Sequence, residues 1–391
     1  MDKDKKLVEL LQNLVKIPSW VSDDETEKWI TNENNLVDYI EKWLRKNTDL
    51  NVIRQKLDYG RFNLIASKGN PEIIFLAHTD TVAPPANPTY SAFGAEVRDG
   101  KVWGRGTADM KCGIAALMQA AILSPDADNY AMIFYADEEY DFLGMKSLIK
   151  ECNHLKPHYL ISADGADLKM GNACRGLIEI RFRVKGKSAH AATGQGINAI
   201  EGVYKITEGV KTFLAKNAHK EMGVSSFNLA YVFGGNGLGA DSVVDGKLLR
   251  VGQEGNVVPN IAEVVIDIRP SSPDISAKII VKEMQSLALK EGLVLEIVNE
   301  RHDLGAWFTD KSELREFEKI AQKVCRVKKI EFNDFRKSGY LDLQMFWEAT
   351  GKPTAFVFGA GSGKTEHTDE ENVEIENLVK TRDFFVEVLA S

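Results

Sequence analysis

The sequence predicts an α/β domain built on a largely parallel sheet, with an α+β domain inserted into it. Short, continuously apolar strands end in histidine or acidic residues and alternate with helical patterns, as at 73–77 and 130–136. Such runs are typical of strands buried on both faces of a parallel sheet. Residues 177–186 instead alternate apolar and charged side chains, which predicts an antiparallel sheet with one solvated face.

The first domain opens with two helical patterns. Apolar residues recur with helical spacing over 7–15, ahead of Pro18, and over 36–44, and this spacing predicts two amphipathic helices. The strands expected in this domain are 51–56, 62–66, 73–77, 130–136 and 354–358. Its later helices are expected at 313–325, 340–349 and 375–389.

The boundaries of the inserted domain follow from the change in pattern. Alternation begins after Gly176 and ends with an apolar strand at 293–298, so we place the insert at 176–298 and the first domain at 1–175 and 299–391. The other elements expected in the insert are helices at 197–216 and 274–290 and strands at 225–233 and 257–269.

The composition limits the kinds of binding partner and the cellular compartment that we expect. The chain has 391 residues, 44% of them hydrophobic, and a net charge of −8. The acidic balance argues against nucleic acid or an anionic membrane surface as the main partner. The start of the chain lacks the apolar core of a signal peptide, no uncharged run is long enough to span a bilayer, and the cysteines fit free thiols in a reducing cytoplasm. They are Cys112, Cys152, Cys174 and Cys325.

Candidate metal ligands stand where the predicted strands end. His78 and Asp80 follow the strand 73–77, and alternate residues of a strand point the same way. A carboxylate two residues after a histidine fits a metal ligand and the partner that orients its ring, but a polar strand terminus gives the same short pattern. Asp109 follows a glycine-rich turn at a helix start, where it would either cap that helix or point towards His78.

Further carboxylates follow two other strands. Glu138 and Glu139 come after the strand 130–136, and Asp164 ends the next apolar strand. Adjacent acids repel one another, so they indicate either a solvated loop or a bound cation. Because ligand sites of open α/β sheets lie beyond the carboxyl ends of the strands, we expect these acids to gather with His78.

A late loop carries both a misleading motif and a candidate ligand. GAGSGKT at 359–365 resembles a phosphate-binding loop, but the motif needs glycine five positions before Gly363, and Phe358 stands there. Nucleotide binding through Lys364 therefore stays as an alternative of a different class. His367, in the same loop after a buried strand, is suited to be a last metal ligand.

These motifs resemble the co-catalytic zinc family that includes acetylornithine deacetylase, succinyl-diaminopimelate desuccinylase, aminoacylase, carboxypeptidase G and peptidases T and V. In the family's order they are HTDTV, GRGTADMKCG, DEE, SAD, GKSAHAATGQGINAI, GNVVPN with IDIR, SGYLD and GAGSGKTEHTDEENV. The resemblance covers nearly the whole chain. It implies a zinc-peptidase-like catalytic domain with a mixed, largely parallel sheet flanked by helices, and an inserted lid and dimerisation domain.

The resemblance implies two Zn²⁺ ions per chain, with Co²⁺ or Mn²⁺ as substitutes. Asp109 would bridge the ions, His78 and Asp164 would complete one site, and Glu139 and His367 the other. Two ions about 3.5–4 Å apart can share a hydroxide and polarise a scissile carbonyl.

The resemblance also assigns roles around the metals. Glu138 would be the general base on the metal-bridging water, and Asp80 would orient His78. His190 of the lid would stabilise the developing oxyanion, often in the partner subunit of a homodimer, although a histidine at a strand end needs no such role. The residues that resemble substrate contacts are Asn260, Arg269, Ser338, Gly339 and Gly361.

The expected activity is hydrolysis of an amide or peptide bond in a small substrate. In the family that the chain resembles, the position of Asp164 is usually Glu in deacylases and carboxypeptidase-like members and usually Asp in dipeptidases and aminotripeptidases, and this chain has Asp164. We therefore favour short peptides with a free amino end, and keep an N-acyl-amino-acid deacylase as the alternative. A silent relative acting as a binding protein is disfavoured because every expected ligand and the base are present.

Overall fold

The chain forms two units in the computed structural model. The structure describes residues 2–21, 33–86, 89–152, 154–237, 243–244, 247–248, 251–252, 255–335 and 340–391. Unit 1 comprises Met1–Asn172, Thr309–Asp334 and Leu341–Ser391. Unit 2 comprises Ala173–Phe308 and Phe335–Tyr340.

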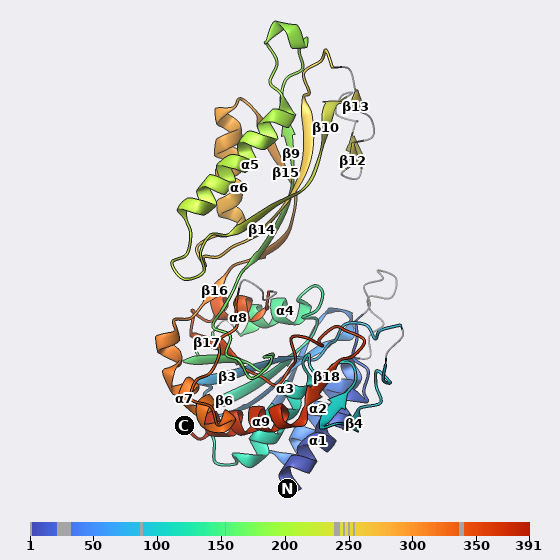
Figure 1. Ribbon diagram of the computed structural model, residues 1–391, viewed down its shortest axis with the longest axis vertical. Coiled ribbons are helices and arrows are strands. Elements are labelled where there is room, and N and C mark those ends of the chain that lie inside the picture. The colour runs from blue at the N-terminus through green and yellow to red at the C-terminus, as the bar shows by residue number, and fades with distance from the viewer. Residues whose placement is uncertain are drawn as a thin grey trace. The chain divides into compact units, whose positions relative to one another are not determined.

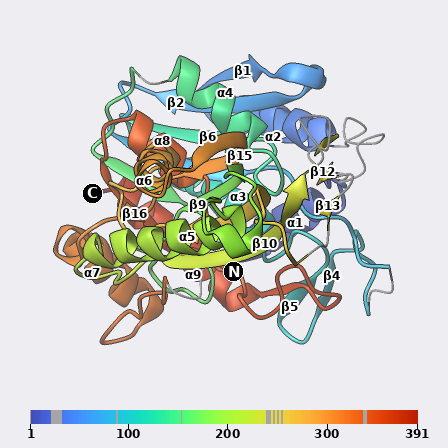
Figure 2. The ribbon, with the colours of Figure 1, turned by 90° about the horizontal axis from the view of Figure 1, so that it is seen from above.

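Unit 1 is built around a six-stranded mixed sheet in the order β1-β2-β6-β3-β7-β17. The four strands from β6 to β17 run parallel, whereas β1 and β2 are antiparallel neighbours at one edge (Figure 2). The strands are β1 Asn51–Lys56, β2 Phe62–Lys68, β3 Ile73–His78, β6 Tyr130–Tyr135, β7 Tyr159–Ser162 and β17 Thr354–Val357. The side chains of β6 are all buried, which explains why its sequence is continuously apolar.

Helices cover both faces of this sheet. In Figure 1, α4 and α8 lie above the sheet, and α1 and α9 lie below it. The helix α3 packs against α1 and α9 as well as the sheet, so it is apolar on all sides rather than amphipathic. The helices of unit 1 are α1 Asp2–Val15, α2 Glu33–Asn47, α3 Lys111–Leu123, α4 Leu143–Glu151, α7 Arg315–Cys325, α8 Leu343–Ala349 and α9 Ile375–Leu389.

A small second sheet joins distant parts of unit 1. Its strands are β4 Glu96–Arg98, β5 Lys101–Trp103 and β18 Asn372–Glu374, in the order β18-β5-β4. The pairing of β18 with β5 holds the loop that carries His367 beside the turn that carries Asp109, although the two residues are far apart in sequence.

Unit 2 contains a five-stranded sheet in the order β13-β10-β14-β9-β15. The helices α5 and α6 pack together on one face of it (Figure 1). Its elements are β9 Leu177–Lys185, α5 Ala199–Lys216, β10 Ser226–Gly237, β13 Val251–Gly252, β14 Ile261–Arg269, α6 Ala277–Lys290 and β15 Val294–Leu304. The remaining short strands are β8 Ala173–Cys174 paired with β16 Trp307–Phe308, and β11 Val243–Val244 paired with β12 Lys247–Leu248.

The helices and strands expected from the sequence all form, and the differences lie at their ends. The strand expected from 257 begins at Ile261, two residues after Pro259, which has no N–H to donate to a ladder. The strand expected to end at 298 continues to Leu304. Register shifts at Ile297/Asn299 and Glu300/His302 break the alternation that marks a strand in the sequence.

All four cysteines are free and buried. Within the described ranges, no helix combines the length and the apolar character that crossing a bilayer requires.

Candidate metal centre

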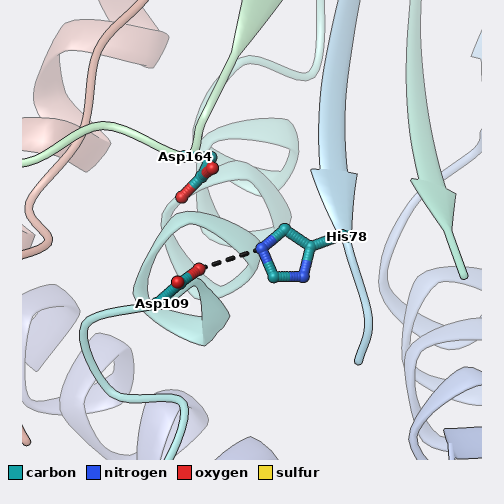
Figure 3. Close-up of side chains that lie close together, drawn as sticks. All are labelled: His78, Asp109 and Asp164. Atoms are coloured by element: carbon teal, nitrogen blue, oxygen red, sulfur yellow. Dashed lines mark hydrogen bonds and ion pairs between the residues drawn. The ribbon is translucent and has the colours of Figure 1, made fainter. Parts of the chain in front are cut away.

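His78 stands at the carboxyl end of β3, where the buried strand opens towards Asp109. The His78 Nε2 lies 2.9 Å from Asp109 Oδ1 (Figure 3). On the other side of the ring, Nδ1 lies 3.1 Å from the backbone oxygen of Asp80 and 3.5 Å from its Oδ1. Such a partner fixes the tautomer and the orientation of a metal-binding imidazole.

Asp80 also holds the backbone of the acidic turn that follows β6. Glu138 N donates to Asp80 Oδ1 and Glu139 N donates to Asp80 Oδ2, each at 3.0 Å. A single buried carboxylate therefore ties the end of β3 to the end of β6. This second contact could not be predicted from the sequence, because nothing in the residue pattern connects Asp80 to those amides.

Asp109 lies between two histidines rather than capping α3. Its Oδ1 contacts His78, and its Oδ2 lies 3.0 Å from His367 Nε2. The N-cap position of α3 is Met110, and no side chain caps it. The capping alternative for Asp109 was therefore wrong, and both carboxylate oxygens face imidazoles.

The candidate ligands form two groups that share Asp109. One group is His78, Asp109 and Asp164, and the other is Asp109, Glu139 and His367; within each group the ligand atoms lie within 4.8 Å of one another. Figure 3 shows Asp109 and Asp164 converging on the His78 ring. Glu139 Oε1 lies 3.1 Å from His367 Nε2.

The charges of this site suit a bound cation. Burial, followed by the Asp109 charge, raises the pKa of Asp164 well above its ordinary value, and burial with the charge of Asp342 does the same to the pKa of Glu138. Hydrogen bonds to Asp109 and Glu139 raise the pKa of His367 to about 10. So many acids in one buried place are costly without a partner, and mixed imidazole and carboxylate donors suit zinc. The residues present therefore fit a metal centre.

Two further buried acids, Glu371 and Asp342, were not predicted from the sequence to contact the ligand segments. Glu371 Oε1 accepts hydrogen bonds from Ala108 N at 3.0 Å and Asp109 N at 3.2 Å, and its other oxygen pairs with Arg105. Tyr135 donates to Asp342 Oδ1 at 2.8 Å. Both acids lie inside motifs already singled out, but only the folded chain shows that they contact the ligand segments.

The remaining expected site residues are distributed over both units. Gly361 is buried in unit 1, where an added Cβ would lie 2.6 Å from Ala108 O, so its lack of a side chain allows a close approach to the Asp109 turn. His190, Asn260 and Arg269 belong to unit 2. Arg269 pairs with Asp267 two residues earlier, at 2.9 Å and 3.2 Å. Ser338 and Gly339 lie outside the described residues.

The phosphate-loop alternative does not match the fold. A phosphate-binding loop leads directly into the N-terminus of a helix. After Lys364 the chain instead forms turns and the strand β18, and α9 begins only at Ile375.

Comparison with known proteins identifies the family. Residues 74–391 match the peptidase family M20/M25/M40. The chain is 28% identical over 294 residues to a probable carboxypeptidase from Aspergillus clavatus, covering 71% of this chain and 66% of that protein. It is 28% identical over 240 residues to the acetylornithine deacetylase of Pasteurella multocida, covering 59% and 62%. These matches span slightly less than two thirds of the length of either relative.

Solved structures share this fold along the whole chain. The aminopeptidase PepT from Bacillus cereus superposes with a TM-score of 0.70 at 20% identity, covering 99% of both chains. A dinuclear metal-binding peptidase of family M20 from Bacillus subtilis gives a TM-score of 0.65 at 13% identity, covering 99% of this chain and 98% of that one. At such identities the similarity shows the fold alone.

Proposed function

The chain belongs to peptidase family M20/M25/M40, and from that premise we propose that it is a dinuclear zinc hydrolase that cleaves the amide bond of a small substrate. The observation that carries the proposal is the position of Asp109. Its two oxygens face two different histidines, and each histidine belongs to a separate group of three candidate ligands. One carboxylate shared in this way suits two neighbouring ions.

The proposed ligands divide between two ions. His78, Asp109 and Asp164 hold one, and Asp109, Glu139 and His367 hold the other. Zinc is the preferred metal because of the mixed donor set, with Co²⁺ or Mn²⁺ as substitutes. When bound, the ions supply Lewis acidity to the scissile carbonyl and to water.

Glu138 is the proposed general base. Its side chain is buried, and its backbone is fixed by Asp80, so the carboxylate has a defined place beside the ligands without belonging to either group. It accepts the proton of the attacking water and passes it to the leaving amine. Asp80 keeps the ring of His78 in the orientation that the ligand needs.

His190 is the proposed oxyanion donor on unit 2. Its Nδ1 accepts a hydrogen bond from Ala192 N at 3.2 Å, so the neutral ring carries its proton on Nε2. That N–H is the donor offered to the developing oxyanion. Asn260, Arg269, Ser338, Gly339 and Gly361 are the proposed substrate contacts.

We propose that unit 2 is the lid and dimerisation domain. Along Ser226–Gly235, β10 pairs with β14 on one side only, within the described residues, and it exposes Tyr231 and Phe233 at 44% and 41%. An exposed apolar edge strand invites pairing with another chain. This supports a homodimer through unit 2, and the buried free thiols support a cytoplasmic location.

The substrate we favour is a di- or tripeptide with a free amino end. The shorter arm of Asp164 supports it, since this acid shapes the edge of the pocket. The alternative is an N-acyl-amino-acid deacylase. It is supported by the similarity to acetylornithine deacetylase and by 27% identity over 285 residues to the succinyl-diaminopimelate desuccinylase of Aliarcobacter butzleri.

A paired substrate panel on the zinc-loaded protein tests the proposal. Free di- and tripeptides are compared with N-acetyl and N-succinyl amino acids. Turnover of the peptides alone supports the peptidase, and turnover of the acylated amino acids alone supports the deacylase. Metal analysis that finds fewer than one zinc ion per chain after zinc-replete purification would contradict the metal centre itself.

A further inference from the structure

A closed ring of buried polar groups joins the two strand ends that carry the metal ligands. Arg61, directly before β2, donates from Nη1 to Asp137 Oδ1 at 2.8 Å. The same guanidinium donates from Nε to Glu33 Oε2 at 2.7 Å, and the other oxygen of Glu33 accepts from the Thr79 hydroxyl at 2.7 Å. We call Arg61, Glu33, Thr79, Asp80 and Asp137 the Arg61 ring.

The polypeptide backbone closes the ring. Thr79 is followed by Asp80, whose two oxygens accept from Glu138 N and Glu139 N. Asp137 directly precedes these two glutamates in the chain. The ring therefore passes through the residues next to His78 on β3 and through the acidic turn after β6.

Arg61 is the only cation among the five members of the ring, against three carboxylates, and every member is buried. Removing one partner of a buried ion pair leaves an uncompensated charge, which is far more costly than the pair itself is worth. The planar guanidinium can serve Glu33 and Asp137 at once through separate N–H groups, whereas a lysine ammonium is a single point of charge. Position 61 therefore requires the planar shape of a guanidinium as well as its positive charge.

The backbone of the acidic turn needs this support. Asp137 has a φ of 68°, in the left-handed region that a non-glycine residue occupies only when its surroundings hold it there. Its carboxylate accepts from Arg61 on one oxygen and from Leu143 N at 3.1 Å on the other. Its carbonyl accepts from Phe142 N at 2.8 Å. Arg61 therefore helps to hold the backbone conformation of Asp137. That conformation sets the direction of the two glutamates that follow it, Glu138 and Glu139.

We propose that Arg61 is a positioning residue for the metal centre, acting through Asp137 on the turn that carries Glu138 and Glu139. Arg61 and Glu33 lie outside residues 74–391, the stretch that matches the family, so two of the five ring members come from the N-terminal part of this chain. The inference rests on the proposed function.

The geometry makes the effect unequal between the two ions. Glu139 belongs to the group with Asp109 and His367 and is absent from the group with His78 and Asp164. A turn that loses its support misplaces Glu139 first. The ion held by Glu139 therefore loses affinity, while the ion held by Asp164 keeps it.

The test is a zinc titration of the full-length Arg61→Lys variant. Chelator-treated protein is titrated with Zn²⁺ against a chromophoric chelator, and the visible spectrum is recorded with Co²⁺ in place of Zn²⁺. We expect one of the two affinities to fall about 10–100-fold, the range typical of a lost partner behind a ligand. The Co²⁺ spectrum changes for that ion only, and kcat falls with little change in KM.

Arg54→Lys is the matched control. Arg54 lies on the neighbouring strand β1 and pairs with Asp38 and Glu41 of α2. Glu33 of the ring is the first residue of α2, so Arg54 joins the same helix to the sheet without contacting the ring. It is expected to keep both affinities and the wild-type kcat.

Asp137→Asn is the second variant, in case Arg61→Lys does not fold. Its side chain keeps an oxygen for Leu143 N but loses the charge that attracts Arg61, and it is expected to weaken the same ion. The inference is overturned if the folded variants keep both zinc affinities and change only the melting temperature, because the ring is then merely structural. If Arg61→Lys does not fold, the result for Asp137→Asn decides alone. Wild-type protein that binds fewer than two ions contradicts the proposed function instead, so the two failures are distinguishable.

Discussion

The sheets of the two units place their charged side chains in opposite ways. In unit 1, β6 is buried along its length and β3 from its second residue onward, so their sequences are apolar and charged groups follow only where the strands end. In unit 2, β9 buries one face and turns the other outward. There Arg183 lies directly across from Glu263 and Arg181 lies diagonally across from it, and they pair with Glu263 at 3.4 Å and 3.1 Å.

This difference explains why the candidate metal ligands lie in one unit. Cross-strand pairs of opposite sign neutralise one another within the sheet of unit 2. At the strand ends of unit 1 the acids outnumber their cationic partners, and burial raises the pKa of Asp164 and Glu138. A site with excess buried negative charge and two imidazoles is suited to bind an external cation, whereas a neutralised sheet face is not.

The largest effect is expected from Glu138→Gln in unit 1. The amide cannot accept the proton of the attacking water, so turnover should fall by about 10²–10⁴-fold, as for other general bases. Zinc content should stay unchanged, because Glu138 belongs to neither ligand group. Steady-state kinetics with metal analysis of the same sample checks both parts, and unchanged turnover would remove Glu138 from the mechanism.

A matched pair of buried acids sharpens the contrast between the units. Glu371→Gln in unit 1 weakens the contact with Arg105 behind the Asp109 backbone, so zinc affinity should fall by about 10–100-fold. Glu263→Gln in unit 2 should leave zinc affinity unchanged and lower the free energy of unfolding by about 1–3 kcal/mol. Equal zinc affinities in the two variants would contradict the expectation that only the buried acid of unit 1 supports metal binding.

In metal-free protein, the buried acids of unit 1 should make the free energy of unfolding depend on pH. Burial raises the pKa of Glu33 from 4.5 to about 7 and that of Asp342 from 3.8 to about 7. The folded state then binds protons more tightly than the unfolded state, so the free energy of unfolding falls as pH rises between these values. The lowered pKa values of Asp80 and Asp109 act below this window.

Melting temperatures of chelator-treated protein, measured between about pH 5 and about pH 7.5, check this direction. Asp342→Asn should flatten the dependence, since it removes one of the groups whose pKa burial raises. A melting temperature that rises with pH over this range would show that other groups dominate.

The smallest effect is expected from Ile180→Val in unit 2. Ile180 is fully buried between the sheet and its helices, and removing one methylene group typically costs about 0.5–1.5 kcal/mol. Denaturant unfolding measures this change, while zinc affinity should match the wild type. A loss of zinc affinity would mean that the core of unit 2 influences the metal site.

Much of the fold was predictable because its patterns are local. Continuous apolar runs identified β3, β6 and β17, and alternation identified β9, since each pattern reports burial on two faces or on one. The end of β15 at Leu304 was missed because its register shifts hide the alternation. The capping interpretation of Asp109 was wrong because a carboxylate at a helix start looks the same in sequence whether or not it caps.

The sequence by itself determined which side chains could bind metal: histidines and acids at strand ends, in an order that resembles a known family. Only the tertiary structure decided how they are held. Asp80 reaches the amides after β6, Glu371 reaches the amides at Asp109, and Arg61 reaches Asp137. These contacts join segments far apart in the chain, and their energies come from burial and charge pairing, which exist only after the strands have assembled.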